Sequence, residues 1–216
     1  MQTRSKNLAT LALISLVLLI ALALVSQSFA RLPRTLKFKP VEFKTPEVDS
    51  LVFPNGLHGY ILEDHEIPVI NIVIMFRTTY PPPDKTGLNQ LAGWAIRNGG
   101  SKNFSKDQID DELEYVGASI ETYCGDLVGT IEANFLTKDT DKVLEILADL
   151  IINPAFEPDK IELRKNTMIE SIRRKADDPN ALGAREFSKL VYRGHPAGLE
   201  PTVETVENLT RDDVVR

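Results

Sequence analysis

The pattern of apolar and polar residues changes along the chain from strand-like alternation to helical spacing. Two short strand-like stretches, 51–53 and 58–63, flank Pro54-Asn55-Gly56, whose turn chemistry predicts an antiparallel hairpin. The next run, 67–78, is apolar and rich in β-branched residues, which is typical of a central strand covered on at least one face. The folded region therefore begins with antiparallel strands.

Capping residues and apolar positions three or four apart predict helices after these strands. Ser105 and Gln108 form a capping-box pattern for a helix that Gly117 ends. Two alternating stretches within 119–136, on either side of Gly125-Asp126, predict a second hairpin. The other predicted helices begin near residue 86 or span 140–152, 158–176 and 180–192. This order indicates an α+β fold, an antiparallel or mixed sheet with helices packed on one face.

The last residues carry the start of a further helix. Thr210 is the predicted N-cap, and the chain stops at Arg216, within the first turns of that helix. A natural carboxy terminus seldom begins a helix that it does not finish. We therefore expect the sequence to be a fragment of a longer protein.

The first 30 residues predict export. Arg4 and Lys6 precede the uncharged run 8–25, and the small residues Ser28 and Ala30 follow, which is the order of a signal peptide. The run is long for a signal core, so an uncleaved membrane anchor is the alternative to cleavage after Ala30. Either interpretation places the protein in the periplasm or cell envelope, with membrane contact only through the amino-terminal segment.

The remainder divides into a lead-in and one domain. Residues 31–50 are rich in proline and charge and lack a helical period, which predicts an extended lead-in before a domain at 51–216. A net charge of −6 with scattered basic residues excludes the clustered basic face of nucleic-acid-binding proteins. Cys124 is the only cysteine, so it forms no internal disulfide, and we expect it to be a small buried strand residue.

Three stretches, in this order, resemble the amino-terminal domain of pitrilysin-type (insulinase, M16) zinc peptidases. They are residues 53–100, residues 113–126 (LEYVGASIETYCGD) and residues 169–199, which end in GHPAGL. The resemblance implies an α/β-roll built of repeated domains, which encloses a peptide-binding chamber and, in active members, holds zinc.

Active members of that family carry an inverted zinc motif, His-x-x-Glu-His, on the helix that follows the equivalent of Gly87-Leu88. Positions i, i+3 and i+4 lie on one helical face, with two imidazoles toward the metal and the carboxylate beside its water. By this resemblance, the two histidines fall on Gln90 and Trp94, and the glutamate that acts as the base falls on Gly93. The third zinc ligand of active members, a glutamate on a later helix, falls on Ser171. None of these residues supplies a zinc ligand or a general base, so no zinc is expected to bind. Glu170 is adjacent to Ser171 but points about 100° away around the helix.

Other candidate metal ligands have simpler interpretations. His58, His65 and His195 have no second histidine within helical reach, and we expect His65 to lie in an exposed turn and His195 in a structural loop. The acidic residues of 107–114 fit no calcium loop and are typical of a solvated helix face. They are Asp107, Asp110, Asp111, Glu112 and Glu114.

The leading hypothesis is a catalytically inactive, exported pitrilysin-type homologue. The resemblance implies a heterodimer in which it helps an active sibling form the peptide chamber, and the strand within Ser119–Phe135 is the candidate for pairing with an extended peptide. One alternative is a zinc metalloendopeptidase whose active site lies in a later part of the full-length protein. Another is a stand-alone binding or scaffold protein of the cell envelope.

Overall fold

The computed structural model describes residues 16–17, 19, 45–175 and 177–216. The predicted export segment, 1–30, and the lead-in as far as residue 44 lie outside the described residues, apart from positions 16, 17 and 19. Among the described residues, no helix has both the length and the apolar character needed to cross a membrane. The chain divides into two compact units, Met1–Glu63 and Asp64–Arg216.

The first unit contains the predicted hairpin. Strands β1 (Asp49–Val52) and β2 (His58–Ile61) pair antiparallel. Gly56 in the turn has a φ of 83°, a left-handed conformation that glycine adopts without a steric cost. The antiparallel hairpin predicted around Pro54-Asn55-Gly56 is therefore confirmed.

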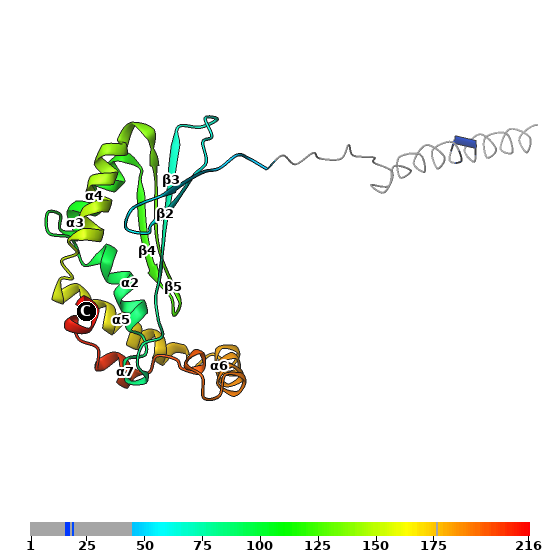
Figure 1. Ribbon diagram of the computed structural model, residues 1–216. Helices are drawn as coiled ribbons and strands as arrows, with labels where there is room; N and C mark the ends of the chain where they lie inside the picture. Colours follow the sequence, from blue (N-terminus) through cyan, green and yellow to red (C-terminus); the bar gives the residue numbers. More distant parts are fainter. Residues whose placement is uncertain (1–15, 18, 20–44, 176) are drawn as a thin grey trace, which may run out of the picture. The chain divides into compact units, whose positions relative to one another are not determined.

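The second unit is built on a three-stranded antiparallel sheet in the order β3-β5-β4 (Figure 1). Its strands are β3 (Val69–Arg77), β4 (Ser119–Cys124) and β5 (Val128–Leu136). The hairpin of β4 and β5 confirms the one predicted within 119–136.

The prediction that the run 67–78 forms a central strand is wrong, because β5 is the central strand of the described sheet and β3 lies at its edge. The inward-facing residues of β3, among them Ile72 and Ile74, pack against the core, as a strand covered on one face requires. Its outward-facing Val73 and Met75 are 59% and 65% exposed. The prediction failed because β3 carries apolar residues on its exposed face as well, and such a continuous apolar run is more typical of a central strand.

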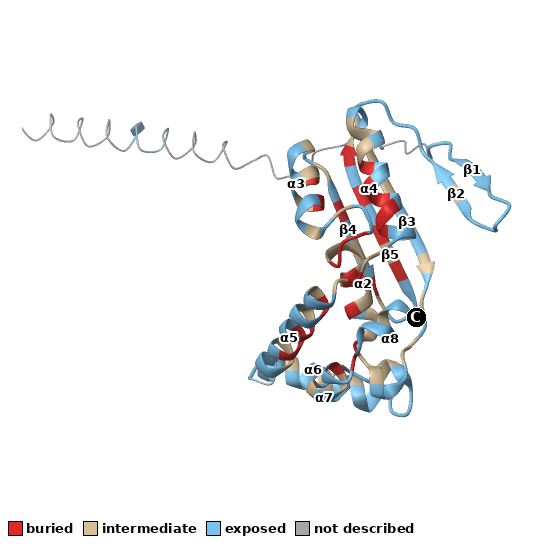
Figure 2. Ribbon diagram, turned by 90° about the vertical axis from the view of Figure 1, so that its left-hand side faces the viewer, coloured by how far each residue is buried: buried red, intermediate tan, exposed pale blue. Residues whose placement is uncertain are grey.

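Helices cover one face of this sheet, which confirms the predicted α+β arrangement (Figures 1 and 2). They are α2 (Leu88–Asn98), α3 (Lys106–Val116) and α4 (Thr140–Ile152). Ser105 and Gln108 form the predicted capping box of α3, and α4 has the predicted bounds. Buried residues of α3 and α4 form one core with Ile131 and Phe135 of β5.

A second core lies among helices on the other side of α2. It joins Leu91 and Ala95 of α2 to α5 (Pro158–Lys175), α7 (Val203–Glu207) and the residues before α8 (Arg211–Val215). Helix α6 (Pro179–Val191) buries no residue. The sequence predicted α5, α6 and the Thr210 cap of α8, but not the five-residue α7.

Lys85 connects the start of α2 to the end of the chain. It lies in a short 3-10 turn, η2 (Pro83–Lys85), and its Nζ donates to Asp213 Oδ2 and to the carbonyl of Asn208, at 2.8 Å each. Hydrogen bonds from Lys85 and from the Thr210 hydroxyl lower the pKa of Asp213 from 3.8 to about 2. The ionised carboxylate is therefore favoured in the folded protein.

We expect this pair to stabilise the fold above pH 4 and to lose its contribution as the pH falls toward 2. The folded pKa lies below the unfolded one, so the stabilisation is present above the unfolded pKa and disappears on protonation. Because Asp213 is 20% exposed and water screens the pair, we expect about 1 kcal/mol. Urea unfolding between pH 5 and pH 2 should show a steeper loss for the unaltered chain than for Asp213→Asn.

Asp212→Asn is the matched control, since Asp212 is an exposed neighbour in the same turn. It should retain the pH dependence of the unaltered chain. Equal pH dependence of the unaltered chain and Asp213→Asn would contradict the assigned role of the Lys85 pair.

Candidate functional site

The candidate site is the face of α2 that carries the degenerate motif positions. Gly87 precedes the helix with a φ of 104°, and its carbonyl accepts from the amide of Leu91. A Cβ on Gly87 would lie 3.3 Å from Met168 of α5 and from Pro201, so the start of α2 packs closely on the helical core. Glycine meets both the backbone and the packing requirement here.

Gly93 brings α2 against the backbone of β4. A Cβ on this residue would lie 2.3 Å from the amide nitrogen of Cys124 and 2.9 Å from the carbonyl carbon of Tyr123. The hydroxyl of Thr122 donates to the carbonyl of Gly93 at 2.5 Å. Position 93, which the resemblance assigns to the general base, therefore has no room for a side chain unless β4 moves.

The other three motif positions have separate surroundings. Gln90 is exposed, and Trp94, one turn further along α2, is half-buried against the helical core. Ser171 lies half-buried on α5, and the adjacent Glu170 is exposed and paired with Arg173 at 2.8 Å. The structure thus brings Trp94 and the α5 face together, but Glu170 does not turn toward α2 as a replacement ligand.

Arg164 of α5 lies beside the motif, and the sequence reasoning missed it. Its guanidinium carbon lies 5.6 Å from the centre of the Trp94 ring, within the range of a cation–π interaction. Arg164 and Ser171 are seven residues apart, which places them about 20° apart around the helix. This seven-residue spacing is the sequence signal that could have placed Arg164 on the same helical face as Ser171.

Arg164 has no hydrogen bond or ion pair with the described residues, and its Nε is buried without a partner. Burial lowers the pKa of the Arg164 guanidinium, although an arginine remains charged at neutral pH. Four other cations of this unit each donate to a carboxylate or carbonyl oxygen: Lys85, Arg97, Lys165 and Arg211. The charge of Arg164 is therefore held by an aromatic ring and not by an anion of the described chain.

Zinc does not fit these residues. Gln90, Gly93, Trp94 and Ser171 offer neither an imidazole nor a carboxylate, and Gly93 cannot be replaced without moving β4. In the part of the chain that the structure describes, no three His, Cys, Asp or Glu side chains lie close enough to hold a metal ion. The site can bind by charge and shape, but it cannot activate water through a metal.

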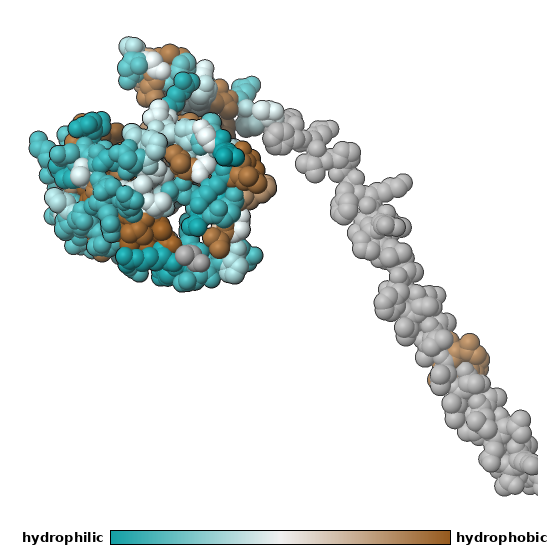
Figure 3. Space-filling model, turned by 90° about the horizontal axis from the view of Figure 1, so that it is seen from below, coloured by the Kyte–Doolittle hydropathy of each residue, from teal (hydrophilic) through white to brown (hydrophobic). Residues whose placement is uncertain are grey.

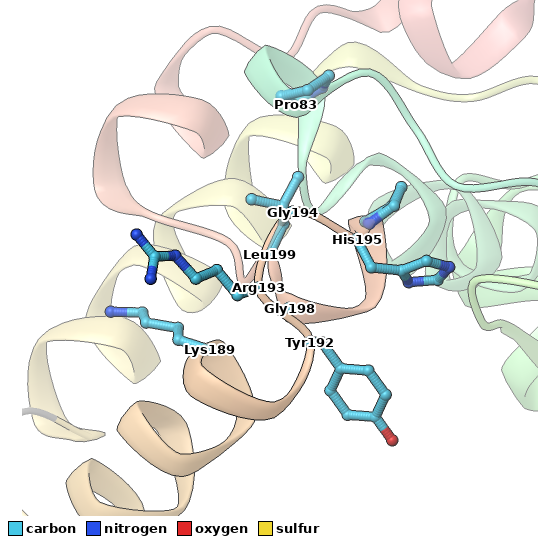
Figure 4. A pocket seen from close by; sticks show the side chains of 9 residues that line it. Pro83, Lys189, Tyr192, Arg193, Gly194, His195, Gly198 and Leu199 are labelled. Carbon is cyan, nitrogen blue, oxygen red and sulfur yellow. The ribbon is translucent and has the colours of Figure 1, made fainter.

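His195 has the structural role that the sequence predicts. Its Nδ1 accepts from the amide of Ala197 at 3.1 Å and caps the short turn η4 (Pro196–Gly198), and its ring meets that of Tyr80 edge-on at 5.6 Å. A cleft of about 400 Å³ adjoins this loop (Figure 4). Lys189 and Arg193 extend to one side of it, away from the His195 ring (Figure 4).

The end of the molecule that carries α6 and α7 has a mixed surface. Seen from this end, apolar patches lie between hydrophilic regions (Figure 3). Helix α6 contributes Phe187, Leu190 and Val191, each more than half exposed.

The acidic residues of α3 are engaged in ion pairs or exposed, as on a solvated helix face. Asp110 accepts from Arg97 at 2.6 Å and from Lys106, and Glu112 pairs with Lys142 at 3.5 Å. Burial alone would raise the pKa of Asp110, but the hydrogen bonds from Lys106 and Arg97 outweigh it and lower the pKa. Arg97 also donates to the carbonyl of Ile120 at 3.1 Å, so this pair joins α2, α3 and β4.

Two further buried groups are structural. Cys124 is buried in β4, as predicted, and burial raises the pKa of its thiol, which disfavours the reactive thiolate. Asp149 is 7% exposed and accepts from the amide of Asn103 at 3.0 Å and from Asn153 at 2.9 Å. Hydrogen bonds from Ser101, Asn153 and Asn103 lower the pKa of Asp149, so this carboxylate holds the loop between α2 and α3.

This chain is similar in sequence to known proteins. The family model described as Insulinase (Peptidase family M16) matches residues 73–202. An uncharacterized zinc protease of Rickettsia bellii is 25% identical over 150 residues, which are 68% of this chain and 36% of that protein. Subunit 1 of the mitochondrial cytochrome b-c1 complex of Mus musculus is 24% identical over 198 residues, 88% of this chain and 40% of that protein.

The fold is shared with solved structures. The M16 inactive domain from Pseudomonas fluorescens superposes with a TM-score of 0.71 at 17% identity, covering 78% of this chain and 42% of that one. The chain thus spans well under half the length of the proteins it matches.

We expect Gly93→Ala to destabilise the protein by about 2–3 kcal/mol, because the new methyl group must displace the backbone of β4. The matched control is Gly183→Ala in α6, where nothing beyond the helix's own backbone and the two chain neighbours lies within 4 Å of the added Cβ. That change should stabilise by about 0.5–1 kcal/mol through helix propensity. Urea unfolding of both variants tests the difference, and a Gly93→Ala protein as stable as the unaltered chain would show that β4 moves aside without cost.

Proposed function

The chain belongs to the insulinase family of peptidases, M16, and from this premise we propose that it is an exported, catalytically inactive member that helps an active sibling form a peptide-binding chamber. The observation that carries the proposal is the closure of the base position at Gly93 by the β4 backbone. A missing ligand could be replaced by a nearby residue, but a position without space cannot hold a carboxylate. In this proposal the chain retains the family's fold but lacks a general base that could take a proton from water.

Strand β4 is the proposed peptide-contacting element. The candidate range Ser119–Phe135 contains β4 and β5, and only β4 lies at an edge of the described sheet. An edge strand can add an extended peptide through main-chain hydrogen bonds. Since Gly93 and Thr122 fix β4 directly to α2, a peptide on this edge would lie next to the degenerate site.

Two considerations support an exported protein with a partner. The order of basic, apolar and small residues in 1–30 is that of a signal peptide or membrane anchor, which gives a periplasmic or envelope location. One relative of similar sequence is named as a subunit of a larger complex, and another as a zinc protease. A sibling with an intact His-x-x-Glu-His helix would supply the zinc and the base that this chain lacks.

The alternative is a zinc metalloendopeptidase whose active site lies in another part of the full-length protein. This chain spans only 36% of the Rickettsia zinc protease that it matches, and this partial coverage favours the alternative. It requires a second motif elsewhere in the protein, since the motif positions of this chain carry no zinc ligand. A stand-alone scaffold in the envelope requires neither a sibling nor a second motif.

We expect the purified full chain to contain less than about one zinc per ten molecules by elemental analysis and to cleave no peptide alone. Mixed with an active M16 sibling from the same organism, it should raise the cleavage rate of a quenched-fluorescence peptide above that of the sibling alone. The reason is that the proposed role is to complete the chamber and not to supply the catalyst.

A sibling whose motif Glu is changed to Gln is the control, and the mixture should then be inactive. Stoichiometric zinc with cleavage by this chain alone would overturn the proposal. No effect of this chain on any active sibling, together with no cleavage, would favour the stand-alone scaffold.

A further inference from the structure

The Arg164 guanidinium is the feature of the site that the proposed function leaves unexplained. It lies over Trp94, on the helical face that also carries Ser171, and no carboxylate of the described chain pairs with it. Its neighbour Lys165, by contrast, donates to Glu162 at 3.1 Å and to the carbonyl of Glu207 at 3.2 Å. The lack of an anion therefore distinguishes Arg164 from its immediate neighbour on α5.

The environment of Arg164 favours an anionic ligand. Its Nε is buried with no acceptor, and a buried donor left without an acceptor costs more than one that is bonded. A carboxylate can accept two parallel hydrogen bonds from the planar guanidinium, and such charge-assisted pairs are stronger than neutral ones. The Trp94 ring, whose centre lies 5.6 Å from the guanidinium carbon, attracts the charge but supplies no hydrogen-bond acceptor.

We propose that Arg164, supported by Trp94, binds a carboxylate of a peptide that lies along the edge of β4. The proposal rests on the proposed peptide-binding function and adds a ligand class to it. The carboxylate is either the peptide's carboxy terminus or an Asp or Glu side chain, since both present the same group. In this arrangement a positive charge lies beside Trp94, one of the degenerate motif positions, and it selects acidic peptides without cleaving them.

The test measures peptide affinity of the full chain by fluorescence anisotropy with two pairs of labelled peptides. One pair differs only in a carboxy-terminal acid or amide, and the other only in an internal Glu or Gln. We expect one pair to show about tenfold tighter binding of the acidic member, and that pair identifies the source of the carboxylate. This comparison uses the unaltered chain and does not depend on the folding of a variant.

The variants then assign the effect to Arg164. Arg164→Gln should abolish the difference between the two members of the pair. The matched control is Arg173→Gln, on the same helix, because Arg173 is exposed and pairs only with Glu170. This control should keep the tenfold difference, and Arg164→Lys should keep part of it because a lysine retains the charge but not the planar fork.

The outcomes separate this inference from the proposed function. Peptide binding that is equal within both pairs, or a difference that persists in Arg164→Gln, overturns the inference and leaves the peptide-binding role intact. Failure of all four peptides to bind overturns both, because the carboxylate site then has no peptide to hold.

Discussion

The approach of α2 to the backbone of β4 at Gly93 is the contact on which the rest of the second unit depends. Helix α2 contributes to both cores: Ile96 packs against the sheet cluster, and Leu91 and Ala95 belong to the helical cluster. Two hydrogen bonds fix the helix along the strand, Thr122 to Gly93 at 2.5 Å and Arg97 to Ile120 at 3.1 Å. A helix held this close by backbone contact sets where α5 can pack, and therefore where Arg164 meets Trp94.

A guanidinium beside an aromatic ring supports different chemistry from a metal ion. A zinc ion polarises a carbonyl and lowers the pKa of bound water, and a nearby carboxylate then takes the proton. A guanidinium stays protonated, so Arg164 cannot accept a proton, and its bond pattern suits planar anions. The charge at the site is thus suited to holding a ligand and not to reacting with one. It is also independent of any metal supply.

Local signals in the sequence predicted the elements that local interactions form. The capping box at Ser105, the bounds of α4 and the Thr210 cap are set by residues within a turn or two of each other, and all three are confirmed. The position of β3 at the sheet edge depends on pairing with β5, almost 60 residues away in sequence, and an apolar run does not reveal it. The short α7 was missed because five residues give too little periodicity to recognise.

The sequence provided candidate positions for the site but not their surroundings. The resemblance assigns Gln90, Gly93 and Trp94 to the motif, and only the structure shows that β4 occupies the space beside Gly93. The position of β4 limits which side chains can be introduced at position 93. A carboxylate at position 93 would need β4 to withdraw from α2, and β4 is the edge on which a peptide would pair. Close packing of the strand and a general base at this position therefore exclude each other, so restoring the three motif residues without rebuilding β4 would disturb the peptide edge before it restored the chemistry.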